Sequence, residues 1–232
     1  MRCYEQFRNG PVFHGLPVRV IGMGGGFSYG HAGPSHFSLE DLALARLQPG
    51  ALALAPVDSA QTRSILLQLQ AVPGPAYLRL DKTEEPDIPA LNGLFAFNAP
   101  QLVRPGNDLL LLSTGSIAQE ALKASDLLQN HGIAAAVAVQ AHLSFRAEDA
   151  LIDLLRTHRA VVTVEEAFRT GGLGSLVAEA IAVHGLSCRL CNQGVNLPLD
   201  GVTGSREYMR RRHGLDATSL ADRARLFLQE LS

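Results

Sequence analysis

A glycine-rich stretch with two histidines, residues 22–36, offers the clearest chemistry in this sequence. It reads GMGGGFSYGHAGPSH and overlaps the end of an apolar run, residues 18–23, which is typical of a buried strand. The glycines therefore lie in a loop at the carboxyl end of a strand, where open α/β sheets bind ligands. Glycine lets the backbone approach a ligand closely, and the imidazoles of His31 and His36 can exchange protons near neutral pH. This combination predicts a reaction site.

Two other chemistries compete for this loop. A dinucleotide-binding fingerprint needs glycines at spacings of two and then three, but from either Gly22 or Gly24 the third position holds an aromatic residue. Residues 26–30, GFSYG, match the G-x-S-x-G nucleophile elbow of serine hydrolases. An elbow usually follows several strands and precedes a helix, whereas Ser28 follows one strand and no clean helix comes directly after it. These departures from the motif argue against the hydrolase hypothesis.

Composition limits the class of protein. The chain has 232 residues, of which 47% are hydrophobic, and a net charge of −2, so it can bury a substantial core. The near-neutral charge argues against a nucleic-acid or membrane-surface partner. The absence of a long apolar run and of a signal-peptide pattern predicts a cytoplasmic protein. Three cysteines are too few for a disulfide scaffold, so reduced thiols are expected.

Four further motifs favour structural roles. The CRLC sequence at residues 188–191 has metal or redox spacing but lacks a second ligand pair. The basic run at residues 210–213 is typical of the solvated end of a helix. The glycine-rich turn at residues 170–175 permits tight packing between a strand and a helix. For Glu165 and Glu166, a helix-capping or intersubunit role is favoured over acid–base chemistry.

Strand-like and helical patterns alternate along the chain, as in parallel α/β sheets. A proline-rich stretch without periodicity, residues 81–105, indicates a domain boundary. We therefore expect an α/β fold with two domains, 1–95 and 96–232, each with a mainly parallel sheet flanked by helices. The predicted strands cover residues 18–23, 51–56, 76–80, 108–113, 133–139, 160–164 and 186–191. The predicted helices cover residues 39–47, 59–70, 147–158, one segment ending near residue 131 and one beginning near residue 172.

Several short motifs, in order, resemble the C-terminal section of the transketolase family. The tetrapeptide GPSH at residues 33–36 is similar to the family's Gly-Pro-Thr-His and is followed by Glu40 and Asp41. Further matches are APVD at residues 55–58, GPAYLR at residues 74–79, and the Glu165–Glu166 pair with GGLG at residues 171–174. The resemblance implies a partial pyrimidine-binding domain over residues 1–95 and a transketolase C-terminal domain, expected to serve dimer assembly, over residues 96–232.

The same resemblance implies a cofactor, thiamine diphosphate with Mg²⁺, shared between two chains. The family's Gly-Asp-Gly motif, which holds the metal and the diphosphate, does not occur in this sequence. No metal ligand or cofactor-binding residue is therefore assigned here, and we expect an N-terminal partner subunit to supply the diphosphate-binding domain within a homo- or hetero-oligomer. The family's activating glutamate lies upstream of the residues present, and Glu5 does not replace it by position.

The absence of that upstream segment would leave the first domain without its first strand and helix. We therefore expect an unpaired sheet edge with exposed apolar faces, and obligate association or poor solubility as the consequence.

Three residues are the candidate site residues that follow from the loop and from the resemblance. His36 matches the histidine that reaches the substrate carbonyl or hydroxyl in transketolases, which makes it the candidate catalytic residue. Lys82 stands near the family's phosphate-binding arginine and would act as a point charge for substrate. His31 has no family counterpart but shares the loop with His36. Ala32 replaces an acidic residue that contacts a sugar hydroxyl, which leaves sugar-phosphate specificity open.

The resemblance implies the C-terminal subunit or fragment of a split transketolase-like enzyme. Such an enzyme transfers a two-carbon ketol unit between carbonyl or sugar compounds, and this chain would be active only with its N-terminal partner. Two alternatives stay open. One is a deoxyxylulose-phosphate-synthase-like or 2-oxoacid-dehydrogenase-beta-like subunit, and the other is a non-catalytic scaffold or regulatory partner.

Overall fold

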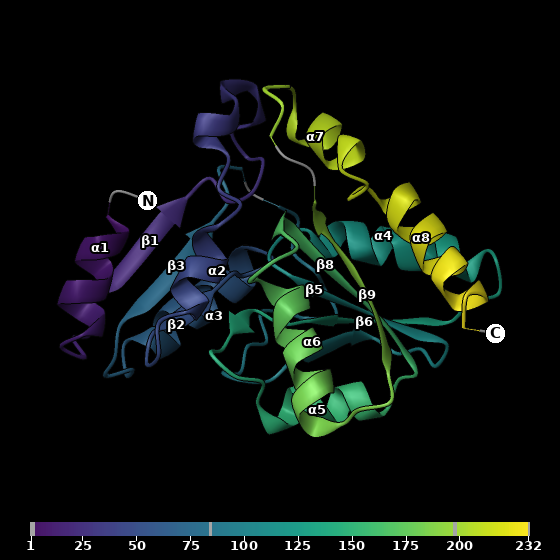
Figure 1. Ribbon diagram of the computed structural model, residues 1–232, viewed down its shortest axis with the longest axis horizontal. Helices are drawn as coiled ribbons and strands as arrows, with labels where there is room; N and C mark the ends of the chain where they lie inside the picture. Colours follow the sequence, from purple (N-terminus) through teal and green to yellow (C-terminus); the bar gives the residue numbers. More distant parts are fainter. Residues whose placement is uncertain (1–2, 84, 197–198, 232) are drawn as a thin grey trace.

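The computed structural model describes residues 3–83, 85–196 and 199–231 and contains two α/β sheets (Figure 1). The strands are β1 (Arg19–Met23), β2 (Leu52–Leu54), β3 (Ala76–Leu80), β4 (Gln101–Arg104), β5 (Leu109–Thr114), β6 (Ala135–Val139), β7 (His142–Leu143), β8 (Ala160–Phe168) and β9 (Arg189–Val195). The α-helices are α1 (Tyr4–Phe7), α2 (Asp41–Arg46), α3 (Ser59–Leu69), α4 (Ala118–Gln129), α5 (Asp149–Arg156), α6 (Leu173–His184), α7 (Arg206–Arg212) and α8 (Ala217–Gln229). Shorter turns are a π-helix (Arg8–Val12) and two 3₁₀-helices (Gly30–Ala32 and Pro34–His36).

The first sheet has the strand order β1-β3-β2-β7. Its first three strands are parallel, and β7, which comes from the second half of the chain, adds to β2 in the antiparallel direction. Helix α3 begins where Asp58 accepts a hydrogen bond from the backbone N–H of Gln61 at 2.7 Å, because this N-cap satisfies a free amide of the first turn. Strand β7 thus ties the two halves of the chain into adjoining sheets.

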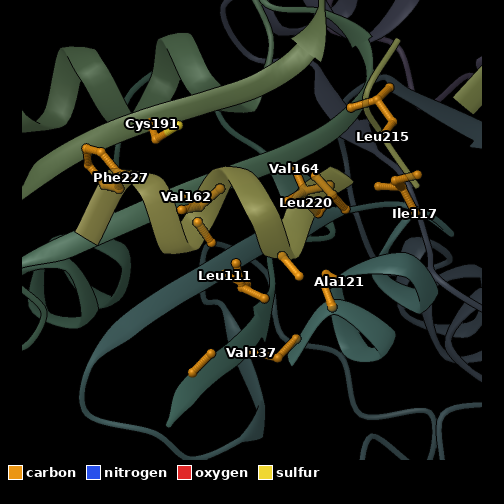
Figure 2. Close-up of a cluster of buried hydrophobic side chains, with 14 of the residues drawn as sticks. Leu111, Ile117, Ala121, Val137, Val162, Val164, Cys191, Leu215, Leu220 and Phe227 are labelled. Carbon is orange, nitrogen blue, oxygen red and sulfur yellow. The ribbon is translucent and has the colours of Figure 1, made fainter. Parts of the chain in front are cut away.

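The second sheet has the order β4-β6-β5-β8-β9 and is parallel except for β4 at its edge. Its central strand β5 is buried on both faces, since alternate side chains point to opposite sides of a strand. Leu111 packs in a cluster with α4 and α8, whereas Leu112 packs in a cluster with α5, α6 and parts of the first sheet. Figure 2 shows the first cluster, with Val162 and Val164 of β8 beside Leu220 of α8.

The predicted fold class is confirmed: two mainly parallel α/β sheets are flanked by helices. Most predicted strands and helices are present with shifted ends. The sequence did not predict β4 and β7, because each is a short edge strand that pairs antiparallel and neither carries a sustained alternation of apolar residues. Strand β4 lies inside the stretch interpreted as a domain boundary. The boundary between residues 95 and 96 stays a prediction.

The outer edge of the first sheet is open in the part of the chain that the structure describes. There β1 pairs with β3 alone, and the side chains of Ile21 and Met23 are 48% and 62% exposed. An open edge and apolar surface were expected, while the association they imply stays a prediction. No helix within the described ranges is long and apolar enough to cross a bilayer.

We expect Leu111→Ala to lower the free energy of unfolding by about 2–5 kcal/mol, because the side chain is fully buried in the cluster of Figure 2 and its loss leaves a cavity. Leu102→Ala in β4 is the matched control: this leucine is 54% exposed, so the change should cost less than about 1 kcal/mol. Urea unfolding of both variants measures the difference. Equal losses in the two variants would show that the packing around β5 is not as described.

Candidate functional site

The glycine loop, residues 24–38, leaves the carboxyl end of β1 and folds back on itself. Gly26 and Ser38 exchange two backbone hydrogen bonds of 2.9 and 3.0 Å, which close the base of the loop. Gly24 and Gly26 have positive φ values of 91° and 60°, which other residues rarely adopt. A Cβ atom on Gly24 would also lie 2.1 Å from the ring of Tyr29. The glycines therefore allow a compact platform from which the two 3₁₀-helices carry His31 and His36.

The structure places two of the three candidate residues, His36 and Lys82, near the ring of Tyr29. The ring centroids of Tyr29 and His36 are 6.4 Å apart, and the Lys82 Nζ lies 4.9 Å from the centroid of the Tyr29 ring. His36 is exposed, and its Nδ1 is 3.0 Å from the Oγ of Ser35. His31 is exposed on the preceding 3₁₀-helix. In the described residues it forms no ring contact or hydrogen bond with His36 or Lys82, so the loop does not gather all three groups.

A pocket of about 440 Å³ opens beside Lys82, where the carboxyl ends of β2, β3 and β5 meet. Arg63 and Lys82 line this pocket and are exposed, whereas Ser116 and Arg206 from the second half of the chain are largely buried. His36 does not line it in the part of the chain that is described. The pocket therefore extends from the Lys82 side of the candidate site into the junction between the two sheets.

A buried carboxylate, Glu166 at the end of β8, underlies the loop. It is 3% exposed and accepts a 2.7 Å hydrogen bond from the backbone N–H of Phe27. It also accepts from Arg206 Nε at 3.0 Å and from Arg210 Nε at 2.8 Å. Burial alone raises the pKa of Glu166, but the two guanidinium groups outweigh it and lower the pKa to about 2. Glu166 is therefore a fixed negative charge at the base of the loop.

Arg206 extends this network to the segment of Lys82. Besides Glu166, its guanidinium donates to the carboxylates of Asp81 and Glu85 and to the hydroxyl of Ser116, each at 3.0 Å. These acidic partners raise the pKa of Arg206 against the opposing effect of burial. One side chain thus bonds to the residue before Lys82 and to the carboxylate below the glycine loop.

Family models match most of the chain. Residues 1–86 match the pyrimidine binding domain of transketolase, and residues 99–220 match the C-terminal domain of transketolase. The chain belongs to the transketolase family. The resemblance seen in the sequence is thereby confirmed.

Relatives within the transketolase family include proteins named as transketolase subunits. The 6-deoxy-6-sulfo-D-fructose transketolase subunit SqwH of Clostridium sp. is 34% identical and is matched over 94% of this chain and 67% of its own length. An apulose-4-phosphate transketolase subunit of Actinobacillus succinogenes is 31% identical over 96% of this chain and 72% of its own length. A solved split-gene transketolase, described as an inactive beta4 tetramer, is 29% identical with a TM-score of 0.83 and covers 98% of this chain and 72% of that chain.

A second set of buried polar contacts, centred on Arg79, holds the far end of the glycine loop at Ser38. Arg79 is 7% exposed, and it donates to Asp41 Oδ2, to the carbonyl of Ser38 and to the carbonyl of Glu166, each at 3.0 Å. Burial raises the pKa of Asp41, but the charge of Arg79 outweighs it and holds the pKa below its usual value. A Cβ atom on Gly25 would lie 2.5 Å from Arg79, so the loop backbone rests directly on this side chain.

The neighbouring glutamate has a different role. Glu165 accepts hydrogen bonds of 2.9 Å from the backbone N–H groups of Leu173 and Gly174 in the first turn of α6, which confirms the predicted helix cap for this residue. Gly172 packs so closely that a Cβ atom would lie 1.9 Å from the Glu165 carboxylate, in agreement with the predicted tight turn. Glu166, by contrast, faces the glycine loop. The two neighbouring glutamates therefore bond to different elements, Glu165 to α6 and Glu166 to the loop.

The interpretation of residues 210–213 as a solvated helix end is wrong for Arg210. Arg211 and Arg212 are exposed, but Arg210 is 6% exposed and bonds to Glu166. The reason is the helical period: Arg206 and Arg210 are four residues apart and therefore share the buried face of α7. This spacing is the signal that the sequence offered for them.

The rival chemistries find little support in the geometry. The Ser28 hydroxyl donates to the carbonyl of Gly25 at 2.7 Å and lies 3.3 Å from Asp81, and α2 begins only at Asp41, so the segment does not form an elbow between a strand and a helix. Cys188 and Cys191 are buried free thiols. Within the described ranges, no three His, Cys, Asp or Glu side chains gather in a way that could hold a metal ion.

Sequence reasoning missed the charged side chains beneath the loop. Arg79, Asp81 and Arg206 are far apart in the sequence from the groups they bind and meet them only in the fold. The available signal was a charge inside a strand: Arg79 interrupts the apolar run of β3, and a buried arginine requires an acidic partner.

The native chain should have a higher free energy of unfolding than the Glu166→Gln variant. We expect this difference to become smaller as the pH falls from about 4.5 to about 2. The folded pKa of Glu166 lies below its unfolded value, so its stabilising effect is complete above pH 4.5 and is lost as the carboxylate protonates. The part that depends on pH should be on the order of 3 kcal/mol. Chemical denaturation at a series of pH values measures it.

Glu148→Gln is the control for this series. Glu148 is exposed and makes no side-chain capping bond to α5, so its removal should change the free energy of unfolding little. If the difference in free energy of unfolding between the native chain and Glu166→Gln stays constant across the same pH range, Glu166 is not an ionised, buried carboxylate.

Proposed function

We propose that this chain is the C-terminal subunit of a split transketolase-like enzyme that transfers a two-carbon ketol unit between carbonyl or sugar compounds, together with an N-terminal partner subunit. The observation that carries the proposal is the placement of His36 and Lys82 around Tyr29, on the loop and strand end of a transketolase pyrimidine-binding domain. Relatives named as transketolase subunits, which match 94–96% of this chain, support the dependence on a partner.

The transketolase family depends on thiamine diphosphate, which supplies the carbanion chemistry when it is bound. The described residues do not by themselves fit its metal and diphosphate, since no metal-binding cluster is found among them. The carboxylates of Asp41, Asp81 and Glu166 at the loop base are already bonded to arginines. We propose that the partner subunit holds Mg²⁺ and the diphosphate, and that the two chains share the cofactor.

We propose that exposed polar side chains of this chain contact the substrate. A Ser35 hydroxyl that donates to Nδ1 of His36 leaves the proton on Nε2, from which the imidazole can donate to a developing oxyanion or pass a proton. Lys82 provides a point charge for an anionic group on the substrate. His31, exposed on the same loop, is the third proposed substrate contact.

We further propose a cytoplasmic oligomer. All three cysteines are free, and two of them are buried, which suits a reducing compartment. The open edge of β1 and the exposed Met23 beside it favour association with another chain, because an unpaired strand edge readily adds a partner. Either a second copy or the N-terminal subunit would satisfy this edge.

Calorimetric titration of thiamine diphosphate with Mg²⁺ should show binding to the mixture of this chain with an N-terminal transketolase-like subunit encoded beside it, and none to this chain alone. The expectation follows from the lack of a metal cluster in the described residues. Binding to this chain alone would refute the shared cofactor. Association of the two chains without cofactor binding would instead support the scaffold alternative. Cofactor binding with pyruvate as the only accepted donor would support the deoxyxylulose-phosphate-synthase-like or 2-oxoacid-dehydrogenase-like alternatives.

In the active mixture, His36→Ala should lower kcat by about 10²- to 10³-fold, because it removes a donor to charge that develops in the transition state. Lys82→Ala should instead raise KM for a phosphorylated substrate, since a point charge binds the ground state and the transition state alike. Steady-state kinetics separate the two effects. His131→Ala, an exposed histidine after α4, is the control and should leave both constants unchanged. Full activity of His36→Ala would exclude its catalytic role.

A further inference from the structure

We infer that Glu166 and Arg206 are positioning residues, which set the spacing between the segments that carry His36 and Lys82. Both come from the second half of the chain, which the family resemblance linked only to dimer assembly. The inference rests on the proposed function in so far as His36 and Lys82 contact substrate, and it adds a role that neither the family match nor the relatives' names assign. Three sets of contacts support it.

The first set holds the loop from below. The carboxylate of Glu166 accepts a hydrogen bond from the backbone N–H of Phe27, whose side chain is fully buried. A Cβ atom on Gly26 would lie 2.6 Å from Glu166, so the backbone rests directly against the buried charge. Because both guanidinium partners keep Glu166 ionised, its hydrogen bond with the Phe27 N–H is charge-assisted. Such a bond is stronger than a hydrogen bond between two neutral groups.

The second set holds the loop from the side. The backbone N–H of Gly204 donates to the carbonyl of Gly30 at 3.2 Å, and a Cβ atom on Gly30 would lie 2.4 Å from the Gly204 carbonyl oxygen. The ring of His213 stacks on Phe27 with 5.1 Å between centroids and 10° between planes. Figure 1 shows the loop beyond β1 reaching the segment that leads into α7. Side and base contacts thus come from the same half of the chain.

The third set joins the loop to Lys82. Hydrogen bonds run from the Phe27 amide through Glu166 and Arg206 to Asp81, with lengths of 2.7, 3.0 and 3.0 Å. Lys82 follows Asp81, and its ammonium group lies over Tyr29, two residues beyond Phe27. The network therefore bonds to both segments near Tyr29, the ring that His36 and Lys82 both approach. A change in any of these bonds shifts the two segments relative to each other.

Hydrogen–deuterium exchange of the full chain tests this role in Glu166→Gln, with Glu165→Gln as the matched control. Both variants replace a buried carboxyl group near the end of β8 with an amide of the same shape, but Glu165 bonds to α6 and not to the loop. We expect exchange in the loop peptide, residues 24–38, to rise at least tenfold in Glu166→Gln. In Glu165→Gln the rise should be confined to the start of α6. Peptides from β5 report any global loss of stability.

Arg206→Lys is the second variant, for use if Glu166→Gln does not fold. It keeps the positive charge, but an ammonium group cannot bond to Glu166, Asp81 and Ser116 together in the planar geometry of a guanidinium. Exchange should rise in the loop and at residues 80–83. Loop exchange that is unchanged in either folded variant, or that rises as much in Glu165→Gln, would overturn the inference.

A double-mutant cycle in the active mixture separates positioning from general structural support. If Glu166 acts through His36, Glu166→Gln should lower kcat/KM about tenfold in the native background but by less than twofold in His36→Ala. Equal losses in both backgrounds would overturn the positioning role. If no partner and no activity are found, the proposed function fails, whereas the exchange experiment still decides whether these residues hold the loop.

Discussion

The structure of the candidate site depends on one buried ionic interaction, between Glu166 and the guanidinium groups of Arg206 and Arg210. Removing a carboxylate from water is costly, and only the close pairing with two arginines and an amide offsets this cost. Because the carboxylate lies on β8, the Phe27 amide on the glycine loop and both arginines on α7, the pairing can form only when these three segments are all in place. The same interaction that makes the charge tolerable therefore specifies how these segments meet.

The apolar core provides the frame for this interaction. One cluster contains Leu42 of α2 and Ala53 of β2 together with Leu110 of β5 and Leu176 of α6, so it belongs to both sheets at once. Strand β7 adds a backbone connection, since it crosses from the second half of the chain to pair with β2. With the halves joined by packing and by a shared sheet, the carboxyl ends of their parallel strands converge at one junction. The glycine loop and the pocket both lie at that junction.

The glycines of the loop have a structural meaning that follows from these contacts. Gly25 rests on Arg79 and Gly26 rests on Glu166, each at a distance that any side chain would violate. The loop is therefore rich in glycine so that its backbone can lie against buried charges, and not only so that it can approach a ligand. The exposed side of the same loop carries His36, which leaves the imidazole free to meet another molecule.

The sequence by itself determined the class of fold, the family and the loop that carries His36, because apolar periodicity and short motifs are local properties of the chain. It also pointed to the helix cap made by Glu165. Only the tertiary structure decided that Arg210 is buried, that β7 joins the first sheet and that Lys82 and His36 both lie near the ring of Tyr29. Pairing between residues 125 and 139 positions apart leaves no local pattern, since it depends on how whole elements pack and on which buried charge needs a partner.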